Sequence, residues 1–565
     1  MEERTRRKVL IIGWDGGTWT VFRPLVARGL MPHLKSLMDR GCHGTLESTI
    51  PYLTPTAWTT LMTGLAPQRH GIIGFHEKGF VGDAVLGGEK DLRPVSSRSV
   101  GFPTLLDYFA DADRRVLSIN VPVTWPPRPV NGILVTGMMT PCGARDFTWP
   151  PELRNELAGY VIDTRHRRQW LPRVFRSTKH EFEGAVREWD GYMRRRTEVI
   201  CRLGREHAWD FGIVILSAPD RIFHRTWPLV ETYLGRGRAE TGVDRALEMF
   251  FRNLDDSLGA ISSALDSDVT MLVSDHGSGL RCPKSVHPNV CLEANGFLFR
   301  RKGSTAGRSH RGRLARVLRR AARRCLESVL SHDMAARFLA RVETREVRVL
   351  RSLDLTRTVA HFVNVDNGEL GAVRLRRETT DRLSAAERAA LIDTIIAALR
   401  TMTDPRTGES VVLDVAPAEK YFPDATVDYL PEIVMRFREG YSGRVDPVEK
   451  DLIGETPVLP AGWHRAGGMY VLAGGPVSAV GESMSLHLAD VAPITLYLAG
   501  LAVPRAMNGQ VPFALLDAEY VRTHPLRRSD PSGEGATTGE EPHRAYTDDE
   551  ARDVRDRLRD IGYLE

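Results

Sequence analysis

Three apolar, β-rich stretches of the chain each run up to an aspartate: KVLIIGWD ends at Asp15, FGIVILSAPD at Asp220, and VTMLVSDH reaches Asp275 with His276 beside it. Buried strands of parallel sheets have such continuous apolar sequences, and ligand sites form beyond the carboxyl ends of these strands. If the three strands are neighbours, their carboxylates surround one crevice. Carboxylates and imidazoles are ligands of divalent metal ions, so the pattern predicts a metal site.

Two further histidines extend this set. His224 follows Asp220 by four residues, so one helical turn would place both side chains on the same face. His464 comes just before the apolar segment 467–475. Taken singly, these features also suit a solvated Asp–His pair, a DHG turn and a structural histidine. Together, three aspartates and three histidines at the edges of predicted core strands form two sets of nitrogen and oxygen ligands for divalent metals.

A hydroxyl group accompanies these ligands in the segment LTPTAWTTLMTG, where Thr54 precedes Pro55. A threonine followed by proline is typical of a helix N-cap and first helical position. The Thr54 hydroxyl would then lie among free backbone N–H groups at the positive end of a helix dipole, which suits an anion such as phosphate. The same pattern fits a simple capping residue, and Thr56 is a second candidate.

The composition is that of a soluble globular protein, with 565 residues of which 42% are hydrophobic and 26% charged. A net charge of +5, from 77 basic and 72 acidic residues, is too balanced for a general nucleic-acid binder. The six cysteines form no CxxC pair and no dense framework, which predicts a reducing compartment and a cytoplasmic location. No apolar run reaches the length of a membrane span. The oligomeric state is left open.

The elements that must position the candidate residues are strands and helices at both ends of the chain. Residues 20–41 have apolar residues near helical spacing, and residues 114–127 predict a short strand closed by prolines. Segments 467–475 and 485–504 predict a strand and a helix that return to the same sheet. The predicted fold is therefore α/β, with a mostly parallel central sheet, helices on both faces and inserted cap regions.

The predicted domain organisation has a core, two insertions and a C-terminal tail. Beyond about residue 526 the chain becomes rich in Ser, Gly, Pro and charge, as flexible tethers are. The predicted parts are a core at 1–280 and 456–525 with an insertion around 76–205, a cap insertion at 281–455, a flexible linker at 526–546, and an amphipathic helix at 547–565.

A basic segment stands out within the predicted cap. Residues 300–325 carry eleven Lys or Arg and no acidic residue. Apolar residues recur there at helical spacing, which predicts a basic helix at 311–330. Such a helix could contact anionic lipid or another polyanion, or it could be a solvated helix of the cap.

The candidate segments resemble the alkaline phosphatase superfamily, and within it the type I phosphodiesterase and nucleotide pyrophosphatase branch. The resemblance rests on IIGWDGG, LTPTAWTTLMTGLAPQRHGI, SAPDRIFH, VSDHGSG, WHRAGGMYVLAGGPV and LADVAPITLYLAGLAVPRAMNGQV, in that order. It implies an alkaline phosphatase-like core and two divalent metal ions, usually zinc and in some relatives manganese. One metal would be held by Asp15, Asp275, His276 and the Thr54 oxygen. The other would be held by Asp220, His224 and His464.

The resemblance also implies a reaction. Thr54 stands ten residues before Gly64, as the nucleophile does in these enzymes, so Thr54 rather than Thr56 is the expected catalytic residue. The implied enzyme hydrolyses phosphodiester or pyrophosphate bonds through a phosphothreonine. A family asparagine that helps to hold a phosphoryl oxygen is replaced by Ala57. A phosphomonoesterase or phosphotransferase of the same superfamily, and a non-catalytic protein that binds anionic surfaces through the basic helix, are the alternatives.

Overall fold

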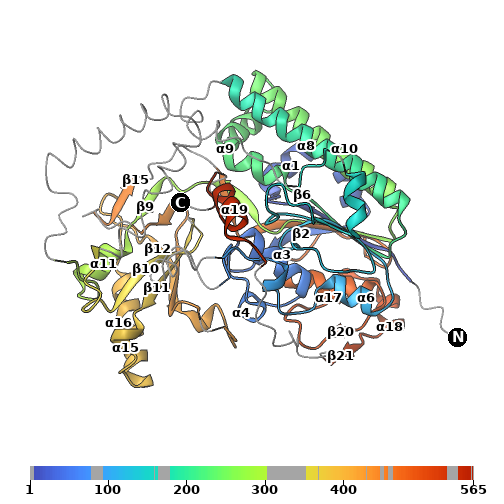
Figure 1. Ribbon diagram of the computed structural model, residues 1–565. Coiled ribbons are helices and arrows are strands. Elements are labelled where there is room, and N and C mark those ends of the chain that lie inside the picture. The colour runs from blue at the N-terminus through green and yellow to red at the C-terminus, as the bar shows by residue number, and fades with distance from the viewer. Residues whose placement is uncertain are drawn as a thin grey trace.

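The computed structural model describes residues 6–77, 93–157, 159–162, 179–301, 352–366, 368–427, 429–445, 451–455, 462–530, 545–560 and 563. A ten-stranded sheet, in the right-hand part of Figure 1, forms the centre of the core. Five of its strands are mutually parallel in the order β7-β1-β6-β3-β4, so their carboxyl ends lie along one edge. The main strands of the sheet are β1 (Val9–Trp14), β2 (Gly41–Glu47), β3 (Val116–Val121), β4 (Gly132–Thr136), β5 (Thr148–Trp149), β6 (Phe211–Leu216), β7 (Val269–Val273) and β17 (Gly467–Gly474).

Strand β17 completes the sheet from the far end of the chain. It runs antiparallel to both β7 and β2 and joins these two strands. The segment that follows forms the helix α17 (Val491–Leu498). This confirms the predicted return of the chain to the central sheet and, with the parallel strands, the predicted α/β fold.

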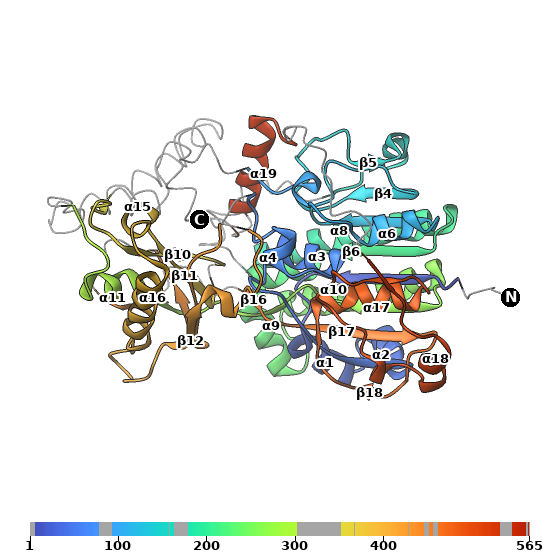
Figure 2. The ribbon, with the colours of Figure 1, turned by 90° about the horizontal axis from the view of Figure 1, so that it is seen from below.

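Helices cover both faces of the sheet because each strand presents apolar side chains to both sides. In β1, Leu10 and Ile12 belong to one buried cluster, whereas Val9 and Ile11 belong to the other. The first cluster packs against α1 (Trp19–Ala27), α2 (Pro32–Asp39), α8 (Lys179–Glu206), α9 (Ala218–Arg236) and α10 (Gly242–Leu265). The second packs against α3 (Thr54–Thr63), α6 (Leu105–Asp111), α17 and α18 (Ala518–Thr523). These helices lie on the opposite side of the sheet in Figure 1, and α3, α6 and α17 are in front in Figure 2, which is seen from below.

Two local predictions need correction. Residues 20–41 form two helices rather than one, because the chain turns between α1 and α2, where Gly29 has a φ of +70° that favours glycine. The predicted insertion around 76–205 is wrong in part, because β3, β4 and β5 from this segment are strands of the central sheet. These strands belong to the central sheet because β3 pairs with β6, which is distant in the sequence.

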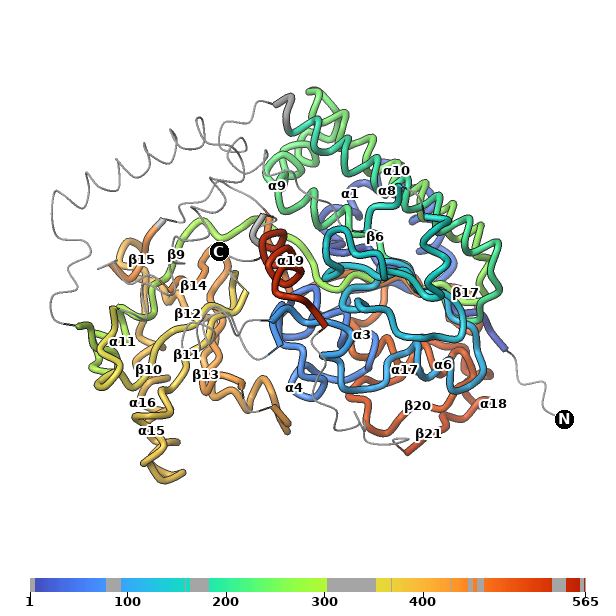
Figure 3. The backbone as a smooth tube through the Cα atoms, in the orientation of Figure 1, coloured from blue at the N-terminus to red at the C-terminus, as the bar shows by residue number. Residues whose placement is uncertain are grey.

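A second unit is built from the described residues between 281 and 455, the range of the predicted cap. The chain leaves the core after β8 (Gly277–Leu280) and returns at β16 (Gly462–Arg465), which pairs with β8. The tube in Figure 3 shows the elements of this unit beside the core, on the left. Between them, a four-stranded antiparallel sheet packs its apolar side chains against α11 and α16. The elements of this unit are β9 (Lys284–Val286), α11 (Pro288–Ala294), β10 (Ala360–Asn364), β11 (Leu370–Leu375), α15 (Arg377–Thr380), α16 (Ala385–Arg400), β12 (Val412–Pro417), β13 (Ile433–Phe437), β14 (Tyr441–Gly443) and β15 (Ile453–Glu455).

The end of the chain comes back to the core. Arg528–Ser529 form β21, which pairs with β20 (Val503–Pro504), so the start of the predicted linker is a strand. The remainder of that linker at 531–544 and the predicted basic helix at 311–330 lie outside the described residues. Helix α19 (Asp548–Asp560) occupies most of the predicted C-terminal helix.

Two general predictions concern membranes and cysteines. Across the residues that the structure describes, no helix combines the length and apolar character needed to cross a bilayer. No two cysteines within those ranges are joined by a disulfide.

Candidate metal centre

The candidate ligands come from the carboxyl ends of three adjacent parallel strands. β1 pairs on one side with β6 and on the other with β7, in register along almost its whole length. Asp15 follows β1, and Asp275 and His276 follow β7 after one intervening residue. Asp220 lies in the first turn of α9, which begins one residue after the end of β6, with Ser217 between them. The pairing of these strands therefore brings together residues that are far apart in the sequence.

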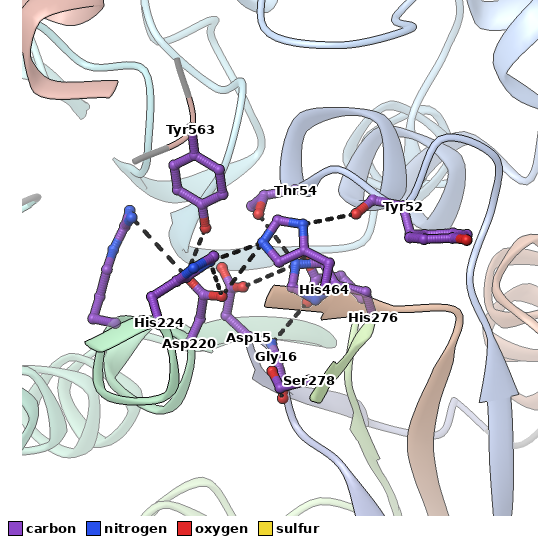
Figure 4. A network of polar contacts seen from close by, with 12 residues as sticks. Asp15, Gly16, Tyr52, Thr54, Asp220, His224, His276, Ser278, His464 and Tyr563 are labelled. Atoms are coloured by element: carbon purple, nitrogen blue, oxygen red, sulfur yellow. Dashed lines mark hydrogen bonds and ion pairs between the residues drawn. The ribbon is translucent and has the colours of Figure 1, made fainter. Parts of the chain in front are cut away.

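Asp220, His224 and His464 form the first compact group, which lies at the centre of Figure 4. The Nε2 atom of His224 is 3.1 Å from Asp220 Oδ1, as expected for positions four apart on α9. His464, on β16, places its Nε2 atom 3.6 Å from the same oxygen. The two Nε2 atoms are 3.0 Å apart. All three ligand atoms thus face a common point and could bind one ion.

His276, Asp15 and Asp275 lie beside this group. His276 Nε2 is 3.7 Å from Asp15 Oδ1 and 3.4 Å from Asp275 Oδ2. A second group consists of Asp15, His276 and Asp220, whose ligand atoms lie within 4.8 Å of one another, so Asp220 is shared with the first group. Asp275 contacts this second group through His276. The other carboxylate oxygen of Asp275, Oδ1, accepts a hydrogen bond from the Gly16 backbone N–H at 3.2 Å. The six predicted carboxylate and imidazole ligands are therefore contiguous.

Thr54 brings a hydroxyl to the same place. Its Oγ1 is 3.4 Å from His276 Nε2, and the side chain is fully buried. Thr54 is the first residue of α3 and Leu53 is the cap, with an extended backbone, so the predicted N-cap role is wrong by one position. Thr56 is also buried, but its hydroxyl makes no hydrogen bond within the described residues. Ala57 is part of the apolar cluster between α3 and the sheet.

Two of the histidines are oriented by hydrogen bonds between their Nδ1 atoms and backbone carbonyls. His276 Nδ1 is 3.0 Å from the Gly277 carbonyl, and His464 Nδ1 is 2.9 Å from the Tyr52 carbonyl. A carbonyl oxygen only accepts, so each Nδ1 carries the proton and donates it. Each Nε2 then keeps its lone pair toward the carboxylates, which is the arrangement of metal-binding histidines.

The charge states at neutral pH also suit a metal centre. Burial lowers the pKa of His276 to about 4 and that of His464 to about 4, so both rings are neutral. Burial raises the pKa of Asp275 to about 6. In Asp220 burial acts to raise the pKa, but the neighbouring histidines outweigh it and hold the pKa well below its usual value. Neutral imidazoles and ionised carboxylates are the protonation states that bind divalent cations.

The donor set fits divalent metal ions. Asp15, Asp220 and Asp275 are each no more than 2% exposed, and burying several carboxylates together is costly without a compensating cation. Asp275 Oδ2 accepts no hydrogen bond from any residue in the described part of the chain. Mixed nitrogen and oxygen ligands are typical of zinc and manganese sites. Which residues bind which ion stays a prediction.

A model of the type I phosphodiesterase/nucleotide pyrophosphatase family matches residues 9–447. The chain belongs to this family. None of the curated proteins matches it. Among solved structures, murine ectonucleotide pyrophosphatase/phosphodiesterase 5 is 13% identical with a TM-score of 0.46, and the match covers 90% of this chain and 100% of that one. The same murine protein in an inactive form in complex with AMP is 14% identical over the same shares, also with a TM-score of 0.46. The human counterpart is 13% identical with a TM-score of 0.46, covering 92% and 99%.

Family membership agrees with the buried ligand groups. Type I phosphodiesterases and nucleotide pyrophosphatases are hydrolases that are typically metal-dependent. The candidate ligands at 15, 54, 220, 224, 275 and 276 lie within the matched range, and His464 lies beyond its end. His464 nevertheless lies against Asp220 and His224, because β16 pairs with β8 next to the β7 strand end.

Two residues that sequence patterns did not single out also contact this site. The Tyr563 hydroxyl donates a hydrogen bond of 2.6 Å to Asp220 Oδ2. Burial and the adjacent Asp220 raise the pKa of Tyr563 well above its usual value, so the hydroxyl keeps its proton. Arg221 is buried next to them, with Nη1 4.0 Å from Asp220 Oδ2. The position of Arg221 directly after Asp220 in the sequence was a possible signal for Arg221, whereas no neighbouring motif points to Tyr563.

Proposed function

We propose that this family member is a metal-dependent hydrolase of phosphodiester or pyrophosphate bonds in which Thr54 is the nucleophile. The observation that carries the proposal is the position of the Thr54 hydroxyl beside His276, at the edge of two ligand groups that share Asp220. Asp15, Thr54, Asp275 and His276 are proposed to bind one ion, and Asp220, His224 and His464 the other. Zinc is the proposed metal, with manganese as the alternative.

Bound at these groups, two divalent cations would lower the pKa of a nearby hydroxyl and offset negative charge on phosphoryl oxygens. The residues of the chain would hold the nucleophile in a fixed position. Thr54 is held at the start of a fully buried helix, so its oxygen is fixed with respect to the ligands. Thr54 is the first residue of α3, and free backbone N–H groups at the start of a helix favour an anionic substrate.

The proposed reaction has two displacements. The Thr54 hydroxyl loses its proton and its oxygen attacks phosphorus, so a phosphothreonine ester forms while the bond to the departing oxygen breaks. The departing oxygen takes up a proton from solvent. Water then attacks the phosphothreonine, which releases the phosphorylated product and returns the proton to Thr54. Each step follows the positioning and charge stabilisation typical of phosphoryl transfer.

Thr54→Ala tests this proposal, with Thr56→Ala as the matched control. Both changes remove a buried threonine hydroxyl from α3, but Thr54 alone of the two lies against His276. With zinc or manganese added, Thr54→Ala should abolish turnover of bis(p-nitrophenyl) phosphate, and Thr56→Ala should retain most of it. Retained activity in folded Thr54→Ala protein would exclude Thr54 as the nucleophile.

The same assays separate the alternatives within the superfamily. A diesterase turns over bis(p-nitrophenyl) phosphate faster than p-nitrophenyl phosphate, and a monoesterase does the reverse. Quenching the reaction on bis(p-nitrophenyl) phosphate with acid and measuring peptide masses should show one added p-nitrophenyl phosphoryl group on the peptide that contains Thr54. A cytoplasmic location and a polyanion contact through residues 311–330 stay predictions from the sequence.

A further inference from the structure

The last described residue of the chain, Tyr563, lies against the candidate metal centre. Its hydroxyl is 2.6 Å from Asp220 Oδ2, as the dashed line in Figure 4 marks. Asp220 is the carboxylate shared by both ligand groups. A residue from the extreme C-terminal region therefore contacts a carboxylate that is proposed to bind one ion together with His224 and His464.

The two oxygens of Asp220 have different neighbours. Oδ1 faces His224 Nε2 and His464 Nε2 at 3.1 and 3.6 Å. Oδ2 accepts the hydrogen bond from the Tyr563 hydroxyl, and Arg221 Nη1 lies 4.0 Å from the same oxygen. A donor on Oδ2 restricts rotation of the carboxylate and keeps Oδ1 directed at the ligand point. This is the role that outer hydrogen bonds have in metal sites.

The Tyr563 ring is itself firmly placed. It packs edge-on to His224 at a centroid distance of 5.1 Å and tilted to His464 at 5.3 Å. On its other sides it meets Phe75 at 5.0 Å and Trp463 at 6.3 Å. The side chain is 5% exposed. The ring thus separates two of the imidazoles from solvent while its hydroxyl reaches the carboxylate.

The helix before Tyr563 is anchored to the core by several contacts. The Tyr563 backbone N–H donates to the Leu558 carbonyl at 2.9 Å, the six-to-one bond that closes many helix C-termini. Just before the other end of α19, the Tyr546 hydroxyl lies 3.0 Å from the Val95 carbonyl oxygen and 2.9 Å from the Met139 carbonyl oxygen, and it donates its one proton to either of them. Apolar side chains of α19 pack into the same buried cluster as Phe75 and Trp463. These anchors place Tyr563 at the metal centre as part of the folded core.

We propose that Tyr563 is a positioning residue of the metal centre: its hydroxyl orients the Asp220 carboxylate, and the docked C-terminal segment thereby completes the site. This inference rests on the proposed function, because it assumes that Asp220 binds metal. It differs from a role as a plug, in which the C-terminal segment would block the site until displaced.

The test compares Tyr563→Phe with Tyr546→Phe. Both variants lose one phenol hydroxyl from the same C-terminal segment and keep the ring, but only Tyr563 bonds to Asp220. Metal-free full-length proteins are titrated with Mn²⁺ and with Zn²⁺ by calorimetry, and the midpoint of thermal unfolding is measured without metal. Loss of an outer hydrogen bond typically weakens metal affinity by about 10- to 100-fold. We expect Tyr563→Phe to weaken one of two equivalents by this factor, with Tyr546→Phe close to wild type.

Each other outcome has a definite meaning. Wild-type affinity in Tyr563→Phe, when the wild type binds two equivalents, would overturn the inference and leave the proposed function intact. Failure of the wild type to bind either metal would overturn the proposed function itself. A version lacking residues 561–565 should also bind metal weakly. If that version instead turns over bis(p-nitrophenyl) phosphate faster than wild type, the segment is a plug and the positioning role is wrong.

Discussion

Gly13 lies in β1, two residues before Asp15, and faces α3 across a very close contact. A Cβ atom added there would lie 3.1 Å from Trp58 Cζ2 and closer still to Trp58 Cη2 and Ile215 Cδ1. Ordinary Cβ contacts are 3.4–4 Å. Trp58 is fully buried on α3, one turn after Thr54, so it has little room to rotate. In Gly13→Ala, α3 should therefore move away from the sheet and carry Thr54 with it.

The size of the effect follows from this geometry. Relief of the clash requires a shift of roughly 1 Å, and a misplacement of that size in a catalytic group costs about 100-fold in rate. Overpacking of a core typically costs about 1–3 kcal/mol in the free energy of unfolding. We therefore expect the kcat of Gly13→Ala on bis(p-nitrophenyl) phosphate to fall by about 100-fold. Its metal content should stay at the wild-type level, because no ligand lies on α3 except Thr54.

Two controls make this prediction specific. Gly101→Ala adds the same methyl group where no atom lies within 4 Å, and should leave kcat unchanged. Adding Trp58→Phe and Ile215→Val to Gly13→Ala removes the atoms that clash and should restore part of the rate. If folded Gly13→Ala protein has the kcat of wild type, the close packing of α3 on β1 does not position the nucleophile.

Further predictions concern the ligands, the metal and the response to acid. Asp275→Asn and His464→Ala should each lower bound metal, measured by mass spectrometry of dialysed protein, and unchanged content in both would refute their assignment. Metal at about 100 times its dissociation constant should stabilise the protein by about 2.7 kcal/mol, so a chelator should lower the unfolding midpoint. Burial lowers the pKa of His361 from 6.5 to about 3. As the pH falls below 6.5, the unfolded chain therefore takes up a proton on His361 that the folded protein does not, and the free energy of unfolding decreases. From about pH 7.5 to about pH 5, wild type should lose about 2 kcal/mol more than His361→Gln in denaturant titrations without metal, and equal losses would contradict this.

Local patterns were enough to predict the core elements that carry the ligands. Continuous apolar, β-rich segments before Asp15 and Asp275 form β1 and β7, because buried parallel strands need such sequences. The four-residue spacing of Asp220 and His224 predicted a shared face, which α9 provides. The assignment of ligands to particular ions came from resemblance to a family, since spacing alone does not distinguish a metal site from a surface pair.

Long-range contacts could not be predicted in this way. β3 and β4 join the central sheet by pairing with β6 and with each other, and nothing in their own sequences specifies those partners. No periodic pattern links Tyr563 with Asp220, which is 343 positions earlier. The helix boundary at Thr54 was wrong by one residue because Leu53 takes the extended backbone of the cap.

The central claim is that two ions bind side by side, one at Asp220, His224 and His464 and the other at Asp15, Thr54, Asp275 and His276. The most direct measurement is anomalous X-ray diffraction from crystals soaked with zinc or manganese, recorded on both sides of the metal absorption edge. Two peaks are expected, one among Asp220, His224 and His464, the other near Thr54 and His276. A metal-loaded crystal with peaks only elsewhere on the protein would contradict the account.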